Sequence, residues 1–224
     1  MRIVNRMFPL AALALCLSTA QLSAQEPGNG NFQWYIGGHG GLLVFRTPSQ
    51  TQGSIPMAGG HMLIVARRTG LMISVDEGIG SDELSSYTDG NGSVQQVRFN
   101  DIRKYSFMLM AFPFRMPIQP YFGVGFGIMH VVHPIGSNEI NSEVAHELGS
   151  SGFGSALGGV QLQLARFVAF GQYQITTVPP IDAITDQTGN LAFGRLLAGP
   201  THTFSVGLRI GLGGARERQA SGGY

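Results

Sequence analysis

The chain has 224 residues, of which 43% are hydrophobic and only 12% are charged, and it contains 33 glycines and a single cysteine. Globular proteins average about 25% charged residues and about 7% glycine, so this chain has roughly half the usual charge and twice the usual glycine. One cysteine excludes a disulfide scaffold, 14 phenylalanines argue against disorder, and no stretch reaches the ~20 apolar residues of a transmembrane helix.

Residues 1–24 have the pattern of a secretory signal peptide that is removed from the mature protein. Arg2 and Arg6 precede the apolar stretch 7–17, and cleavage is expected after Ala20 or Ala24, of which we favour Ala24. Either cleavage removes the only cysteine, which excludes thiol chemistry. The mature chain keeps 12 basic and 13 acidic residues, a net charge of −1, and it has no clustered basic face. This charge distribution excludes a nucleic-acid partner.

The mature chain is dominated by segments in which apolar side chains alternate with small or polar ones. The clearest is 120–130 (PYFGVGFGIMH), where every second residue is apolar and those between are mostly glycine. A strand turns successive side chains to opposite faces, so this pattern indicates one apolar face and one nearly bare face. Eight segments of this kind occur, at 32–45, 61–67, 71–76, 97–112, 120–130, 155–164, 167–177 and 204–212. No convincing helical stripe follows the signal peptide, and we predict an all-β chain.

The connections between these segments alternate between short and long. Residues 68–70, 113–117 and 165–166 are short, whereas 46–57, 80–96, 134–150 and 178–200 are long and polar. Tight turns at one end and long loops at the other are typical of a transmembrane barrel whose two ends face different compartments. Because lipid offers no hydrogen-bond partners, such a barrel must close, and the first segment must pair with the last. We therefore predict a closed up-and-down antiparallel transmembrane β-barrel of eight strands.

On these features the mature chain resembles the small eight-stranded outer-membrane β-barrels, namely the OmpA transmembrane domain, OmpX and the opacity-type adhesin barrels. The signal peptide, the alternating segments, the loop asymmetry and the glycine-rich strand PYFGVGFGI carry the resemblance. It implies an architecture and an outer-membrane location rather than one activity. One departure is the end of the last strand near Leu212, which is not aromatic and is followed by residues 213–224.

If the apolar faces meet lipid, the opposite faces line the lumen. Asp76, Lys104 and Arg209 would then lie inside, with Arg103 or Asp101 beside them. Buried charges need partners, so we predict an internal cluster in which Asp76 pairs with Arg209 or Lys104. Aromatic residues near strand ends are expected at the membrane interface. These are Trp34, Tyr35, Phe112, Tyr121 and Phe167.

Other candidate sites are weaker. His130 and His133 lie at a strand end, but their spacing puts them on opposite faces of an extended strand, which disfavours joint metal binding. Asp89 begins a turn-like DGNG sequence that lacks the closing acidic ligand of a calcium loop. His146 with Glu143 or Glu147 fits a short helical turn. A lipid-modifying enzyme needs a histidine beside a serine, for which the candidates are His202 with Ser205 and His61 with Ser54.

We predict residues 1–24 as a cleaved signal peptide, 25–212 as the barrel and 213–224 as a flexible tail. The expected role is structural or in surface interactions through the long loops, which hold eight acidic residues. We expect no enzymatic activity, cofactor or metal site. The expected partners are outer-membrane lipid and lipopolysaccharide, the barrel-assembly machinery and an unknown extracellular ligand. Two alternatives are a barrel enzyme acting on envelope lipids and a soluble lipocalin-like carrier of an apolar ligand. The eight acidic loop residues are Asp82, Glu83, Asp89, Glu139, Glu143, Glu147, Asp182 and Asp186.

Overall fold

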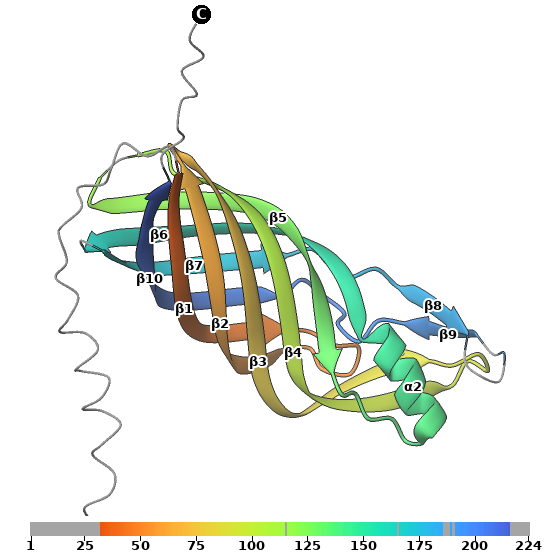
Figure 1. Cartoon of the computed structure of the whole chain (residues 1–224). Coiled ribbons are helices and arrows are strands. Elements are labelled where there is room, and N and C mark those ends of the chain that lie inside the picture. Colours follow the sequence, from red (N-terminus) through yellow and green to blue (C-terminus); the bar gives the residue numbers. More distant parts are fainter. Residues whose placement is uncertain (1–31, 115, 165, 186–188, 190, 216–224) are drawn as a thin grey trace, which may run out of the picture.

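The computed structural model describes residues 32–114, 116–164, 166–185, 189 and 191–215; the predicted signal peptide and residues 216–224 of the predicted tail lie outside them. Its dominant feature is an antiparallel β-barrel (Figure 1). The wall consists of β1 (Phe32–Phe45), β2 (Gly53–Ala66), β3 (Thr69–Thr88), β4 (Val94–Ala111), β5 (Ile118–Val132), β6 (Ser150–Leu164), β7 (Phe167–Thr176) and β10 (His202–Ala215). The predicted eight-stranded, closed antiparallel barrel is confirmed.

The barrel closes by pairing of its first and last strands. β1 pairs antiparallel with β2 on one side and with β10 on the other, and the β2–β3 pairing completes the ring. The short connections 67–68, 112–117 and 165–166 all lie at one end, which we call the turn end. The opposite end is the loop end. Every wall strand therefore has two hydrogen-bonded neighbours, which leaves no open edge in the barrel.

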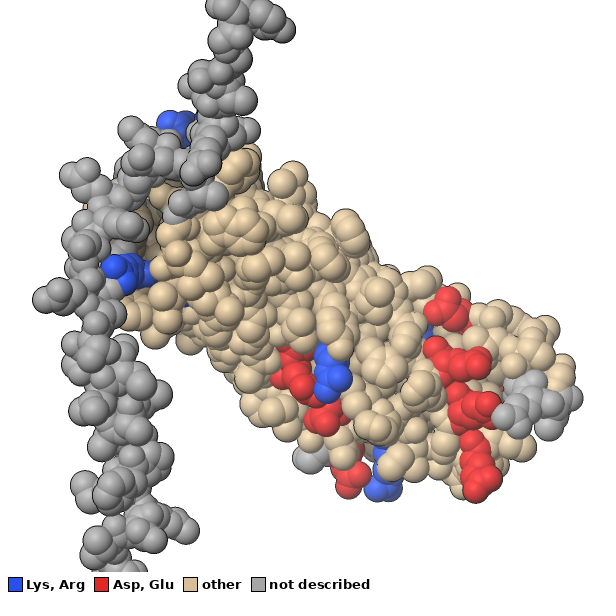
Figure 2. Space-filling view, in the orientation of Figure 1, with Lys and Arg blue, Asp and Glu red and all other residues tan. Residues whose placement is uncertain are grey.

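The side-chain faces have the predicted orientation. On β5 and β10 the alternating apolar residues point outward and are more than 40% exposed, whereas Asp76, Lys104 and Arg209 point inward and are buried. Figure 2 accordingly shows few charged side chains over the barrel wall. A soluble carrier has the reverse arrangement, with a polar exterior, so that alternative is wrong. Among the described residues, no helix has the length and apolar character to cross a membrane.

The long connections are more regular than predicted. β3 and β4 continue past the barrel as one long hairpin, 134–150 contains the helix α2 (Glu139–Leu148), and 178–200 contains the hairpin of β8 (Asp182–Thr185) and β9 (Leu191–Gly194). We call residues 80–100, 133–149 and 177–201 the cap. α2 begins after Asn138, whose side chain accepts a hydrogen bond from the Asn141 amide. The short helical turn expected around His146 is thus part of a helix of ten residues.

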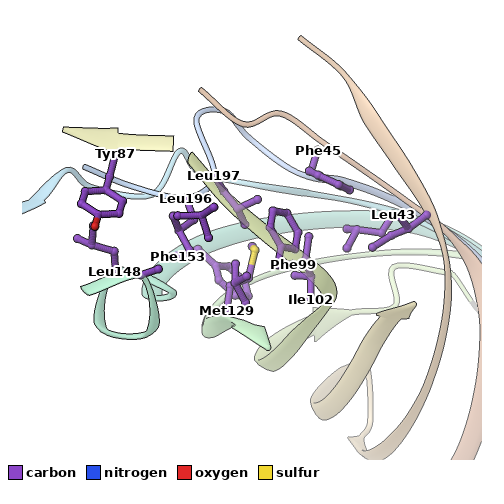
Figure 3. Close-up of a cluster of buried hydrophobic side chains, with 14 of the residues drawn as sticks. Leu43, Phe45, Tyr87, Phe99, Ile102, Met129, Leu148, Phe153, Leu196 and Leu197 are labelled. Atoms are coloured by element: carbon purple, nitrogen blue, oxygen red, sulfur yellow. The ribbon is translucent and has the colours of Figure 1, made fainter. Parts of the chain in front are cut away.

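Two apolar layers fill the interior. The layer at the turn end contains Leu63, Met72, Met108, Met110, Phe112, Tyr121, Leu157 and Phe170. The layer at the loop end continues from the barrel into the cap, as Figure 3 shows for Phe45, Phe99, Phe153, Leu148 and Leu197. Cap residues are therefore packed into a hydrophobic core together with barrel residues. A band of polar side chains lies between the two apolar layers.

Candidate functional site

The buried polar band is assembled from strands at both ends of the chain. His39 is on β1, His61 on β2, Asp76 on β3, Lys104 on β4 and Arg209 on β10. Each side chain points inward because it lies on the face opposite the apolar residues of its strand. All five are buried: the side chains of His39 and Asp76 are 2% and 5% exposed, and His61, Lys104 and Arg209 are also enclosed.

Asp76 and Lys104 are brought together, as one of the predicted alternatives required. The Lys104 Nζ lies 3.8 Å from Asp76 Oδ2. It also donates hydrogen bonds to Gln174 Oε1 at 2.9 Å and Thr203 Oγ1 at 2.8 Å. Three oxygen atoms thus surround a buried ammonium group, which offsets part of its desolvation cost.

Arg209 is not brought to Asp76. Its Nε donates to His61 Nε2 at 2.8 Å, and its Nη1 donates to Gln161 Oε1 at 2.9 Å. The guanidinium also lies over the Phe170 ring, 4.0 Å from its centroid. Cation–π contact and planar donation suit arginine better than lysine at such a position. Arg209 is therefore linked to Asp76 only through the two histidines.

The hydrogen bonds through the histidines run in a single direction. Arg209 can only donate, so His61 Nε2 must accept and the His61 proton must sit on Nδ1. His61 Nδ1 faces His39 Nδ1 at 3.2 Å, which must then accept. The remaining proton of His39 is on Nε2, which donates to Asp76 Oδ1 at 2.7 Å. We assign both imidazoles as neutral, in opposite tautomers, from this network.

Neither histidine of this network was predicted as a member of the lumen cluster, and His61 was predicted only as a possible partner of Ser54. His39 lies in the run Gly37–Gly41, where glycines on either side hide the alternation. His61 sits at the start of its predicted segment, and its link to His39 depends on strand register. Parity is the signal that places His39 inward, since it shares a face with the buried Leu43 and Phe45, but Leu42 and Val44 on the other face are apolar too, so the sequence does not show which face is inward. The partner assignment needed the β1–β2 register.

The predicted interface aromatics divide between the two faces. Trp34 and Phe167 point outward and are exposed. Phe112 and Tyr121 are each 2% exposed and pack against one another inside the barrel, with ring centroids 5.8 Å apart, so their placement at the interface was wrong. Tyr35 is half-buried and donates to Gln33. Nearness to the turn end predicts the depth of all five residues in the membrane, whereas strand parity decides which face each side chain occupies.

Parity also corrects the expectation for Arg103 and Asp101. Both lie on the outer face of β4, because the residue between them, Ile102, is buried. Arg103 donates to Glu77 Oε1 of β3 at 2.6 Å, and this pair lies on the outer surface. Along the outer face of β3 the pair lies between two exposed apolar residues, Val75 and Ile79.

The two predicted serine–histidine pairs are not formed. Ser205 is buried in the lumen, whereas His202 hydrogen-bonds to Tyr173 on the outer face at 2.6 Å. Ser54 is exposed, whereas His61 points inward. A different pair is in contact: the register places His130 opposite Ser150, with Nδ1 and Oγ 2.6 Å apart. Its detection required the β5–β6 pairing, which the sequence does not reveal.

No group of three or more metal-ligating side chains is formed within the described residues. The ring of His130 lies beside that of His146 rather than that of His133, with the two ring centroids 5.6 Å apart. The DGNG sequence is the turn of the β3–β4 hairpin, where Asp89 Oδ1 accepts from the Asn91 and Ser93 amides. The hydrogen bond from the Gln95 side chain, followed by that from the Ser93 amide, lowers the pKa of Asp89 below its ordinary value.

The closed wall, the apolar exterior and the enclosed charges define the chain as a small eight-stranded barrel of the outer-membrane type. The structure is similar to that of neisserial surface protein A (NspA), with a TM-score of 0.52 and 10% identity over 79% of this chain and 96% of that chain. It also matches OprG from Pseudomonas aeruginosa, with a TM-score of 0.48 and 11% identity over 82% of this chain and 98% of that chain. No family model and no curated protein sequence matches the chain.

Proposed function

We propose that the chain is an integral outer-membrane protein of a Gram-negative-type cell, with a structural or surface-interaction role presented by the cap. The observation that carries this proposal is the packing of the cap. Tyr87, Leu148 and Leu196, from three separate connections, join one hydrophobic core with barrel residues. A connection that serves only to join two strands does not need a core of its own. A packed cap gives a fixed surface for recognition.

The distribution of side chains on the wall supports the membrane location. Exposed apolar patches of more than a few hundred square ångströms are rare on soluble monomers. Here outward apolar residues cover the wall, and near the loop end the Glu77–Arg103 pair lies among them, between Val75 and Ile79 of β3. Trp34 and Phe167 are placed by this proposal at headgroup depth on the turn side. Lipid and lipopolysaccharide are then the partners of the wall, and the assembly machinery is its partner during insertion.

The orientation follows from the asymmetry of the two ends. In outer-membrane barrels the short turns face the periplasm and the long connections face outward. The cap, with its surplus of acidic residues, is therefore extracellular in this proposal. An exported precursor with a signal peptide at 1–24 belongs to the same proposal. The barrel extends past its predicted end at 212, because β10 continues to Ala215 and pairs there with Phe32 of β1.

The lumen cluster has a structural role in this proposal. Asp76, Lys104 and Arg209, joined by His39 and His61, fill the band between the two apolar layers. An eight-stranded barrel leaves room only for side chains. The charges would thus fix the arrangement of the strands rather than form a path for solutes.

The test is the electrophoretic mobility of the full-length protein in the outer-membrane fraction, boiled and unboiled. A closed barrel resists dodecyl sulfate until heated, so we expect a mobility shift on boiling. Trypsin added to intact cells should cut within the cap at Arg98 or Arg195 and leave the barrel in the membrane. Recovery in the soluble periplasmic fraction without a shift would overturn the proposal.

A further inference from the structure

The outer face of the cap carries apolar residues that lie far from the lipid-facing surface. The strands are ordered β4-β3-β9-β8 there. The register aligns Val94, Thr88, Phe193 and Ala183 in one row across these four strands. Val94 is 69% exposed, Phe193 47%, and Leu191, the next outward residue of β9, 50%. Tyr87 and Ala192, on the opposite face, are buried in the core.

Lipid does not account for this exposure. Ile79, 56% exposed, is the last apolar outward residue of β3 before the exposed Arg98–Asp82 pair, and Thr88 follows it by nine positions. At about 3.3 Å per residue, the row lies roughly 30 Å farther along the strand. Between the two apolar regions the outer surface carries the exposed Arg98–Asp82 pair. The row is thus a second apolar surface, separated from the first by charged residues.

The row ends at a strand with a free edge. β8 is the terminal strand of the sheet order, and no described strand pairs with its second edge. In Figure 1, β8 lies at the margin of the cap, on the far side of β9 from the extended ends of β3 and β4. The main-chain groups of a free edge are a template for one more strand. An added strand would extend the row Val94–Thr88–Phe193–Ala183 by one position.

The negative charge of the cap favours a positively charged partner. The described residues of the cap include seven acidic side chains but only two arginines. Arg98 is paired with Asp82, and Arg195 donates to the Pro179 carbonyl oxygen. Figure 2 shows the red side chains gathered at this end of the molecule. The seven acidic residues are Asp82, Glu83, Asp89, Glu139, Glu143, Glu147 and Asp182.

We propose that the free edge of β8 and the apolar row beside it dock an extended, cationic, amphipathic polypeptide segment of a partner protein. The segment adds one strand to β8, lays alternate apolar side chains beside Ala183, Phe193 and Leu191, and places its basic side chains among the acidic residues. This inference rests on the proposed function, because it names the chemistry of the cap's partner.

The probe is a fluorescent seven-residue peptide of alternating lysine and valine, titrated into the folded full-length protein in detergent and followed by anisotropy. Two further peptides carry N-methyl groups, one on the lysine amides and one on the valine amides. In an extended strand the amides of alternate residues point to the same edge, so only one of these two sets of amides can form hydrogen bonds with β8. The variants are Phe193→Ser and, as a matched control, Phe114→Ser, which removes an exposed phenylalanine at the turn end.

We expect saturable binding that weakens as salt is added, because exposed charges are screened. Phe193→Ser should weaken it about tenfold, because apolar burial is lost, and Phe114→Ser should leave it unchanged. At least one methylated peptide should lose binding to the unaltered protein, which keeps the test independent of any variant's folding.

Three results overturn the inference. The first is no binding of the unmethylated peptide. The second is undiminished binding of both methylated peptides, which shows charge attraction alone. The third is a protein dimer that Phe193→Ser dissolves, which makes a second copy the occupant. The boiling shift is measured on the same sample. A sample that shifts but does not bind contradicts only this inference, whereas a sample that does not shift contradicts the proposed function.

Discussion

The imidazole rings of His39 and His61 approach each other above glycines of the neighbouring strands. Their Nδ1 atoms are 3.2 Å apart, yet the register pairs His39 with Gly59 and His61 with Gly37. A Cβ on Gly37 would come within 2.7 Å of the His61 ring, and a Cβ on Gly59 within 2.7 Å of His39 Nε2. Each imidazole therefore occupies the space that a larger residue on the neighbouring strand would fill. The glycine-rich run around His39 makes room for the network.

The first prediction concerns the positions of the imidazole protons. His61 should carry its proton on Nδ1 and His39 on Nε2, because Arg209 can only donate and Asp76 accepts. Nitrogen NMR of histidine-labelled protein in micelles at neutral pH distinguishes the two tautomers, and His39→Asn and His61→Asn assign the signals. Identical tautomers, or a doubly protonated ring at either position, would contradict the single direction of the chain.

The second prediction tests the space above Gly59. Gly59→Ala should destabilise the barrel by about 1–3 kcal/mol, the usual cost of overpacking, because the new methyl group meets the side chains of His39 and Asp76 and the Val75 carbonyl oxygen. Gly60→Ala is the matched control, since its Cβ points outward and meets only the Gly37 carbonyl oxygen at 3.7 Å. The midpoint of urea unfolding, followed by the loss of the unboiled band, measures both. Equal effects of the two substitutions would show that the histidine packing is not what requires glycine.

The third prediction concerns the buried Asp76–Lys104 contact. Asp76→Ala leaves Lys104 a buried charge without its carboxylate and leaves His39 Nε2 without its acceptor. Removing one partner of a buried pair costs about 3–5 kcal/mol, so the unfolding midpoint should fall sharply. Adding Lys104→Met should recover part of that loss, since methionine fills the space without a charge. A double variant as unstable as the sum of the two single variants would show that the residues are not coupled.

The fourth prediction separates the stability of the cap from that of the barrel. Leu148 is buried in the cap core, whereas Ile140, on the same helix, is exposed. Leu148→Asp should detach α2 and speed trypsin cleavage at Arg98 or Arg195, while the boiling shift persists. Ile140→Asp should do neither. Loss of the shift in Leu148→Asp would mean instead that barrel and cap fold as one cooperative unit.

The wall of the barrel was predictable because its constraint is local and repeated. Lipid outside and a crowded lumen inside impose alternation on every strand, and the outward faces of 120–130 and 204–212 are as the pattern indicates. Asp76 and Lys104 were found on the same ground. The partner of Arg209 was not predictable in this way. Arg209 and His61 are 148 positions apart, and only the register of β2 and β10 with β1 brings them together.

The cap was less predictable for a different reason. Outside the membrane the surroundings do not impose a regular alternation of apolar and polar residues on each strand. The elements β8, β9 and α2 each bury only a few side chains, such as Ile184, Ala192 and Leu148. Segments this short leave no pattern that stands out from a polar loop. Phe112 and Tyr121 show a second limit: distance from a turn estimates depth, whereas only parity assigns a face.

The hydrogen-bond chain from Arg209 to Asp76 has a consequence for assembly. Its donors and acceptors come from β10 at one end of the chain and from β1, β2 and β3 at the other. Until the first and last strands meet, the guanidinium lacks its imidazole acceptor in the lumen, and in an incomplete sheet its Nε–H has no acceptor from β2. Closure satisfies this donor and the β1–β10 backbone at the same step. The network therefore stabilises the closed barrel relative to a partly closed one during insertion.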